Sequence, residues 1–320
     1  MVEELPERLF DEKVSTTFRP NNPGAEKWLY RPIECLDKGF VYLADYSGND
    51  EAIVRAARVS LGNTDPRSIK QNKELIRYLR AHRHTSPFEM VEFKFHCKLP
   101  IFVARQWIRH RTASVNEQSG RYSVLENGDY LPEGSALRRQ SKSNKQGGDE
   151  ELSLAEQQLV LNILQSGYNA QESRYRHLLS DDFDLARETA RLSLTVATYT
   201  QWYWKIDLHN LMHFLSLRLD PHAQYEIRVY AEAMARIIKD AVPLSWEAFE
   251  DYQLQAMQLS KQEQDFLKKM FNLISWSASW LQRDKVLAMI NEAFPKDDCW
   301  KGEKREFIEK LTKLGILSSS

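Results

Sequence analysis

The strongest constraint on the fold of this chain is the strict alternation of residue types between Val91 and Leu99. In this segment (VEFKFHCKL) every odd-numbered position is apolar and every even-numbered position is polar. A period of two residues is that of a β-strand, because successive side chains point to opposite faces of a sheet. The alternation therefore predicts a strand with one buried face and one face in contact with water. Two further strands are predicted over residues 39–46 and within the aromatic run 194–206.

Helices are predicted where apolar residues recur at helical spacing after a capping residue. Ser68 and Asp207 can each cap a helix, and Pro100 can end the strand and occupy the first turn of a helix to about Ile108. Asp220 and Pro221 resemble the N-cap and first position of another helix. The predicted helices cover 50–59, 68–79, 100–108, 152–178, 182–190, 207–215 and 220–242, with irregular stretches at 109–125 and 135–150.

Composition narrows the class of protein. The 320 residues are 42% hydrophobic and 28% charged, which is ordinary for a globular protein. A net charge of −1 gives no general attraction for nucleic acid or a membrane surface, so an anionic ligand must be bound by local arginines. Three scattered cysteines favour a reducing compartment over a disulfide framework. With neither a signal peptide nor a transmembrane helix expected, the chain is predicted to be cytoplasmic.

The segment with the most chemical content runs from Gln106 to Tyr122 (QWIRHRTASVNEQSGRY). Its three arginines surround one histidine and one glutamate, and apolar residues are few after Ile108. Such a segment cannot be core, because buried unpaired charge is costly. The planar guanidinium group suits phosphate, so a phosphorylated ligand is one interpretation. A solvated arginine-rich loop is the other, and residue types alone do not separate the two.

Four short motifs together resemble those of the flavin-dependent thymidylate synthases. Arg109-His110-Arg111, followed by seven residues and Ser119, is similar to the signature of that family. Three further segments resemble the family's R-A-A-R-V-S, H-x-T-P-F-E and L-R-x-D-x-H-A-Q segments, in the right order: Arg55–Ser60, His84–Glu89 and Leu217–Gln224. The resemblance covers roughly residues 33–253.

The resemblance implies a fold, a reaction and an assembly. The fold would be an α/β (α+β) catalytic domain over residues 32–253, with a mixed, mainly antiparallel sheet flanked by helices. Residues 1–31 would form an N-terminal extension and 254–320 a helical C-terminal extension. The reaction would convert dUMP to dTMP, with methylenetetrahydrofolate as carbon donor and FAD reduced by NADPH as hydride source. Four identical subunits would build sites at their interfaces.

The resemblance also assigns roles to individual residues. Arg218 would act in catalysis by lying near the uracil ring and favouring its electron-rich form. The dUMP site would comprise Gln106, Arg109, Glu117, Gln118, Ser119, Gly120, Arg121, Arg191 and Arg218. The FAD site would comprise Ser86, Arg109, His110, Arg111, Glu117, Asp207, His209 and His213. No metal is expected.

Three of the FAD positions depart from the family pattern. Asp207 and His213 stand where the family often has Asn, and His209 stands where an Arg occurs. An ionised Asp accepts hydrogen bonds only, so it cannot replace the donor of an amide.

Two alternatives to dTMP synthesis are open. The same flavin chemistry could modify another pyrimidine nucleotide. In a different class, the arginine cluster could belong to a nucleic-acid-binding module, although such a module is expected to be basic and rich in interleaved aromatics. The cysteines are consistent with the flavin route, because the unrelated thymidylate synthases attack uracil with a cysteine thiolate and no cysteine here is in a reactive-looking setting. Cys97 lies on the apolar side of its strand, and Cys35 and Cys299 lie outside the motifs.

Overall fold

The computed structural model describes residues 6–9, 20–60, 62, 68–125, 128–142, 147–275, 283–293 and 301–314. The chain forms two compact units. Met1–Ile53 and Ser86–Pro243 make up the first, and Val54–Thr85 and Leu244–Ser320 make up the second.

The first unit is built on a five-stranded sheet in the order β1-β2-β3-β7-β4. Each pair of neighbouring strands is antiparallel. The alternating segment forms the central strand β3, in which Phe93, Phe95, Cys97 and Leu99 are all fully buried. The strands are β1 (Ile33–Cys35), β2 (Gly39–Ser47), β3 (Glu92–Pro100), β4 (Ser114–Glu117) and β7 (Tyr199–Asp207).

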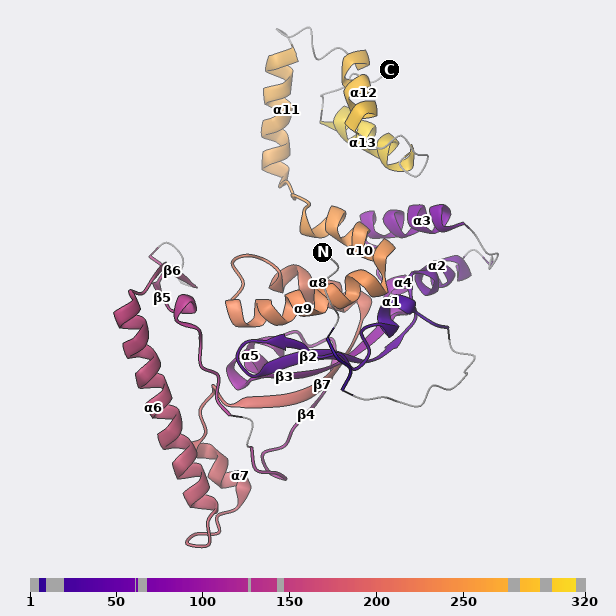
Figure 1. Ribbon diagram of the computed structural model, residues 1–320. Coiled ribbons are helices and arrows are strands. Elements are labelled where there is room, and N and C mark those ends of the chain that lie inside the picture. Colours follow the sequence, from indigo (N-terminus) through magenta and orange to yellow (C-terminus); the bar gives the residue numbers. More distant parts are fainter. Residues whose placement is uncertain are drawn as a thin grey trace. The chain divides into compact units, whose positions relative to one another are not determined.

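Helices cover the buried face of this sheet. α9 (Tyr225–Ala241) packs on β1 and β2, and α8 (Leu208–Arg218) packs on β7 and α9 (Figure 1). α5 (Ile101–Trp107) inserts Trp107 into the same layer, where its ring stacks on Phe214 at a centroid distance of 4.8 Å. The predicted α/β (α+β) fold with a mainly antiparallel sheet flanked by helices is therefore confirmed.

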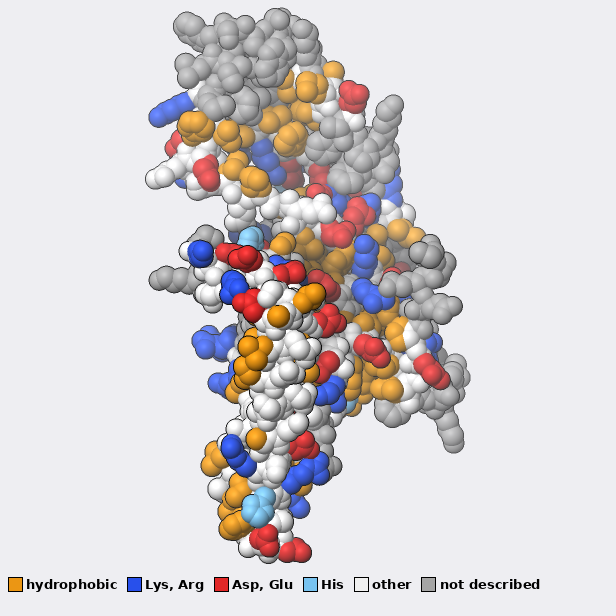
Figure 2. Space-filling model, turned by 60° about the vertical axis from the view of Figure 1, so that its left-hand side comes forward, with side chains coloured by type: hydrophobic (Ala, Val, Ile, Leu, Met, Phe, Trp, Pro, Cys, Tyr) orange, Lys and Arg blue, Asp and Glu red, His pale blue; other side chains and the backbone are white. Residues whose placement is uncertain are grey.

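Helix α6 (Leu154–Leu179) lies outside this layered core, whereas α1 (Pro23–Glu26) packs on α9 and α4 (Ser86–Glu89) packs on α8. α6 is a 26-residue helix that buries only Tyr175, and apolar side chains are visible along it in Figure 2. The other elements of the unit are short: η1 (Gly134–Ala136), the hairpin of β5 (Arg138–Gln140) and β6 (Gly148–Glu151), α7 (Arg187–Ala190) and η2 (Arg191–Ser193).

The prediction that Asp220 and Pro221 begin a helix was wrong. The Asp220 side chain accepts a hydrogen bond from the backbone N–H of His222 at 2.8 Å, and its carbonyl accepts from Ala223. These bonds close a turn, so α9 begins only at Tyr225. The aromatic strand also starts later than the predicted run, at Tyr199, because Thr195 and Thr198 both donate to Asp129 in the preceding loop.

The second unit is helical. Ser68 caps α3 (Ile69–Ala81) in a capping box with Gln71, as predicted. The C-terminal segment forms helices, also as predicted: α10 (Pro243–Phe249), the π-helix η3 (Glu250–Leu254), α11 (Lys261–Ser275), α12 (Arg283–Ala293) and α13 (Lys301–Lys313). α2 (Asp50–Val59) spans the boundary between the two units.

No helix in the described part of the chain is long and apolar enough to cross a membrane. Within the same residues, no group of three or more His, Cys, Asp or Glu side chains is arranged to hold a metal ion.

Candidate active site

The arginines that follow α5 differ in their partners from most others in the chain. α5 is anchored by its buried residues Val103, Ala104 and Trp107, and the chain then emerges at the surface. Arg109 and Arg111 are exposed, and their side chains form no ion pair or hydrogen bond with any described residue. Their charge is therefore available to an anionic ligand.

His110, between these arginines, points inward instead. Its ring lies 5.7 Å from that of Phe214, 6.2 Å from that of Trp204 and 5.5 Å from that of His213, measured between centroids. Burial, followed by the positive charges of His213 and Arg218, lowers the pKa of His110 below its usual 6.5. The ring is therefore neutral at pH 7. Its Nε2 is buried without a hydrogen-bond partner among the described residues.

α8 carries four of the predicted site residues. Asp207 caps it, and its two carboxylate oxygens accept hydrogen bonds from the backbone N–H and side-chain amide of Asn210, at 2.9 and 2.7 Å. His209 and His213 follow one turn apart, and Arg218 is the last residue of the helix. α4, which begins with Ser86, packs against α8.

Arg218 is a half-buried cation that has no counter-ion among the described residues. Burial lowers the pKa of its guanidinium group, and its Nε is fully buried with no hydrogen-bond partner in the described part of the chain. Gln106, on α5, has a side-chain oxygen in the same condition. Polar atoms buried without a partner are rare in folded proteins, and a bound polar ligand is one way to satisfy them.

Gln106 and Arg218 both line a cavity of about 1580 Å³ in the first unit. Its other walls come from the turn between α8 and α9, the start of α9, and the hairpin β5–β6 with the segment before it. This volume exceeds the roughly 300–1,000 Å³ typical of a site for one small ligand. The hairpin wall was not predicted, because residues 135–150 lack any periodicity and are expected from sequence to form a plain loop.

A second group of predicted residues meets at α7 and η2. Gly120 is buried, and a Cβ atom added there would lie 3.3 Å from Cδ of Arg191 and 3.0 Å from Cδ1 of Leu125. Arg121 forms an ion pair of 3.1 Å with Glu188. Glycine therefore lets the loop approach Arg191 closely.

Strand β4 positions the residues that precede this loop. Glu117 lies opposite Trp202 of β7, and its carboxylate accepts a hydrogen bond from the Thr200 hydroxyl at 2.8 Å. The backbone N–H of Gln118 donates to the carbonyl of Gln201 at 2.8 Å. The Ser119 carbonyl then accepts from the backbone N–H of Tyr122 and closes a turn. Pairing at a sheet edge thus holds a segment that was expected to be irregular.

The unpaired polar groups described above suit an anionic ligand that carries a heterocyclic ring. The unpaired arginines Arg109 and Arg111 match phosphate groups, and the partnerless atoms of Gln106, His110 and Arg218 match the polar edge of a heterocyclic ring. Asp207 is less suited to binding a ligand, because its two carboxylate oxygens already accept hydrogen bonds from the backbone N–H and the side-chain amide of Asn210.

Comparison with known proteins identifies the family. The family model described as thymidylate synthase complementing protein matches residues 42–244. The chain is 51% identical over 271 residues to the flavin-dependent thymidylate synthase of Rickettsia conorii, covering 81% of this chain and 91% of that protein. It is 54% identical over 245 residues to the enzyme of the same description from Gluconobacter oxydans, covering 76% and 80%. The chain therefore belongs to the thymidylate synthase complementing protein family, and the predicted resemblance is confirmed.

A solved structure supports the fold. The UMP/dUMP methylase PolB from Streptomyces cacaoi, bound with 5-Br dUMP, superimposes with a TM-score of 0.63 at 36% identity. The match covers 69% of this chain and 99% of that one.

Two sets of expectations stay predictions: the limits of the catalytic domain at residues 32 and 253, and the roles of single site residues.

Proposed function

We propose that this chain synthesises dTMP from dUMP by flavin-dependent reductive methylation. Methylenetetrahydrofolate donates the carbon and NADPH is the reductant. Membership of the family and about 50% identity to flavin-dependent thymidylate synthases support this function. The observation in the structure that supports it best is the set of unpaired cationic and polar groups at Arg109, His110, Arg111 and Arg218.

FAD, when bound, supplies the redox chemistry by accepting hydride from NADPH and delivering it to the one-carbon unit. The protein's own contribution is binding, orientation and charge. Arg109 and Arg111 hold phosphate groups, and neutral His110 offers a ring nitrogen to the flavin. Ser86, His209 and His213 are proposed as further flavin contacts, because α4 and α8 pack together and the rings of His110 and His213 are adjacent.

Arg218 is proposed as the catalytic residue. Its guanidinium group is partly shielded from water, with Nε fully buried, and no carboxylate among the described residues pairs with it. A cation in this state stabilises negative charge more strongly than one in water, because the local dielectric constant is low. Placed beside the uracil of dUMP, it would favour the electron-rich form of the ring that attacks the carbon donor.

The cysteines support a route without a thiolate nucleophile. Cys35 and Cys97 are free and buried, and burial raises the pKa of both thiols well above the usual value. Neither can form an exposed thiolate at neutral pH. Cys299 lies outside the described residues. Free thiols also suit a reducing compartment, which supports our proposal that the enzyme acts in the cytoplasm.

The active enzyme is proposed to be a homotetramer with sites at subunit interfaces. The support is α6, which stands outside the core and exposes Leu154, Leu159 and Ile163. Exposed apolar side chains on a long helix are typical of a surface that another protein covers. Loop residues Ser119–Arg121 and Arg191 would complete the dUMP site in the assembly.

A product assay tests the reaction. Purified protein is loaded with FAD and incubated with dUMP, methylenetetrahydrofolate and NADPH, and the nucleotide product is identified by mass. Formation of dTMP, absent when NADPH or folate is omitted, is the expected result. Protein that binds no flavin, or that oxidises NADPH without altering dUMP, would refute the proposal.

UMP is a second candidate substrate. The similarity to PolB, described as a UMP/dUMP methylase, favours testing it. The same assay with UMP in place of dUMP decides whether the ribose 2′-hydroxyl is tolerated.

A further inference from the structure

Helix α3 of the second unit carries a row of basic residues. Lys73, Arg77 and Arg80 recur at spacings of four and three, so they share one face of the helix. Arg77 is the central one, and its side chain is only 1% exposed. An arginine this deeply buried requires anionic partners, because leaving its charge unpaired would be very costly.

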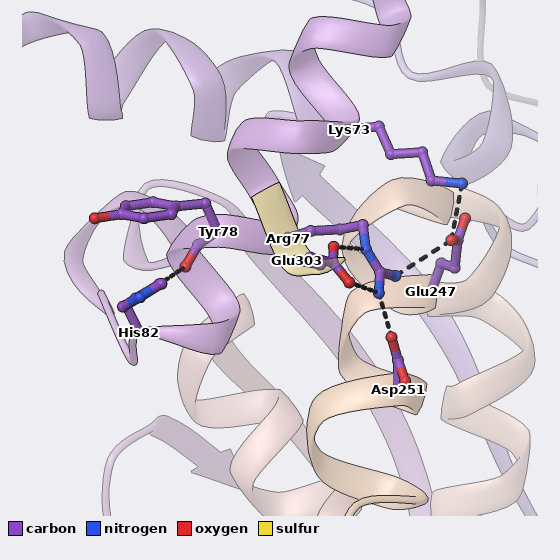
Figure 3. A network of polar contacts seen from close by, with 7 residues as sticks. All are labelled: Lys73, Arg77, Tyr78, His82, Glu247, Asp251 and Glu303. Carbon is purple, nitrogen blue, oxygen red and sulfur yellow. Dashed lines mark hydrogen bonds and ion pairs between the residues drawn. The ribbon is translucent and has the colours of Figure 1, made fainter. Parts of the chain in front are cut away.

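Three carboxylates from the C-terminal part of the chain surround Arg77 (Figure 3). Glu247 of α10 lies 3.3 Å from Nη1, and Asp251 of η3 is paired with Nη2. Glu303 of α13 accepts from both Nε and Nη2, the latter at 2.8 Å, in a bidentate arrangement. Glu303 therefore makes the geometrically strongest contact of the three.

Glu303 is also the best shielded of these carboxylates. Its side chain is 18% exposed, against 42% for Glu247 and 50% for Asp251. Ion pairs are weakened by solvent, so the pair least in contact with water contributes most. The ion pair of Arg77 that is best shielded from water therefore comes from α13, which lies beyond the family match at residues 42–244.

α13 makes a second contact one turn further along. Glu306 lies 3.6 Å from Nε2 of His82, the C-cap residue of α3, within ion-pair distance when the imidazole carries a proton on both nitrogens. Nδ1 of His82 is 2.9 Å from the carbonyl oxygen of Tyr78, and the two rings lie 4.2 Å apart. Arg83, which follows, has a φ of 58°, a left-handed conformation that is unfavourable for a residue other than glycine. The turn after α3 is therefore one that its surroundings must hold in place.

We propose that α13 is an intramolecular clasp. Through Glu303 on Arg77 and Glu306 on His82 it holds the end of α3 and the strained turn that leads along the chain into the His84–Glu89 motif. By ordering that turn it positions the motif for flavin binding, a consequence that rests on the proposed function. Arg77 and Glu303 are positioning residues, and the C-terminal extension has a defined task.

The test compares two single-charge changes on α13 in the full-length chain. Glu303→Gln removes the bidentate carboxylate, whereas Glu309→Gln removes an exposed carboxylate on the same helix that has no partner among the described residues. Hydrogen exchange is followed in peptides covering α13 and residues 78–86. FAD affinity is measured in parallel by fluorescence titration.

Glu303→Gln is expected to speed exchange about tenfold in both peptides, since a hydrogen bond between charged groups contributes roughly that factor. The affinity for FAD should fall about threefold or more, because apparent affinity decreases with the fraction of molecules whose turn is ordered. Turnover at saturating FAD should be unchanged. Glu309→Gln should alter none of these quantities, and Glu303→Asp, which keeps the charge, should restore part of the protection.

Two results would overturn the clasp: unchanged exchange in α13 of Glu303→Gln, or faster exchange in α13 with no change around His82. Unchanged FAD affinity despite faster exchange in both peptides would overturn its link to the flavin. Because hydrogen exchange needs no flavin or substrate, a wild-type protein that bound no FAD would refute the proposed function and leave the clasp to be decided by exchange alone.

Discussion

Replacing Arg218 by alanine separates its proposed catalytic role from a structural one. The guanidinium Nε is buried without a partner in the described part of the chain, and burial lowers the pKa of the group. If that donor meets the uracil ring, removing it should lower kcat by about 10²–10³, or about 2.7–4 kcal/mol of transition-state stabilisation. Folding stability should move the other way or not at all, because an unpaired, half-buried charge is unfavourable in the folded chain. Arg218→Ala should therefore be nearly inactive with an undiminished Tm.

The matched control is Arg228→Ala. Arg228 lines the same cavity, but its Nη1 donates to the Pro221 carbonyl at 2.8 Å and its Nε lies 3.5 Å from Glu232. Because its charge is already paired, its loss should cost less than about tenfold in turnover. dTMP is quantified by mass at saturating substrates, and bound FAD by its absorbance. The reasoning fails if Arg218→Ala turns over within tenfold of the wild type, or if the variant has lost its flavin.

Three further predictions concern groups with different roles. The combined variant Cys35→Ala, Cys97→Ser and Cys299→Ala should still form dTMP; a folded but inactive variant would contradict a route without a cysteine nucleophile. Asp207→Ala should lower the free energy of unfolding by about 1 kcal/mol through loss of the helix cap, and denaturant titration measures it. His110 has a folded-state pKa below 6.5, so the unfolded chain takes up its proton first as the pH falls. Stability should therefore decline as the pH drops through about 6.5, and His110→Gln should flatten that decline; an unchanged slope would show that His110 does not cause it.

The core of this fold was predictable from the sequence because its signals are local. The alternation over Val91–Leu99 predicts which side chains are buried, and in the structure Val91 and every odd-numbered residue of β3 are buried. The caps at Ser68 and Asp207 likewise need only residues within three positions of each other. The capping signal gave a wrong prediction at Asp220, because its side chain accepts a hydrogen bond from the backbone N–H of His222 and closes a turn instead of starting a helix.

The site was less predictable, because it depends on contacts between distant segments. Nothing in the spacing of His110, His213 and Arg218 indicates that the ring of His110 lies beside that of His213, or that its pKa is lowered by both of the others. The cavity wall formed by β5 and β6 has no periodic pattern, so it could not be separated from a loop. Motif resemblance predicts the site residues, and the fold shows which of these predicted residues lie close together.

The contacts of the arginine side chains explain why residue types alone could not separate a phosphate site from a solvated loop in the segment Gln106–Tyr122. A solvated loop and a phosphate site have the same composition, and they differ in what the arginines contact. Arg121 has a carboxylate partner in Glu188, as a solvated surface residue often does, whereas Arg109 and Arg111 have none among the described residues. A chain with 45 acidic residues and 44 basic ones has ample carboxylates to pair with every arginine. The exposed Arg109 and Arg111 are free to bind an anion, but the stronger indication is Arg218, whose buried Nε has no partner in the described part of the chain and which a bound anionic ligand would satisfy.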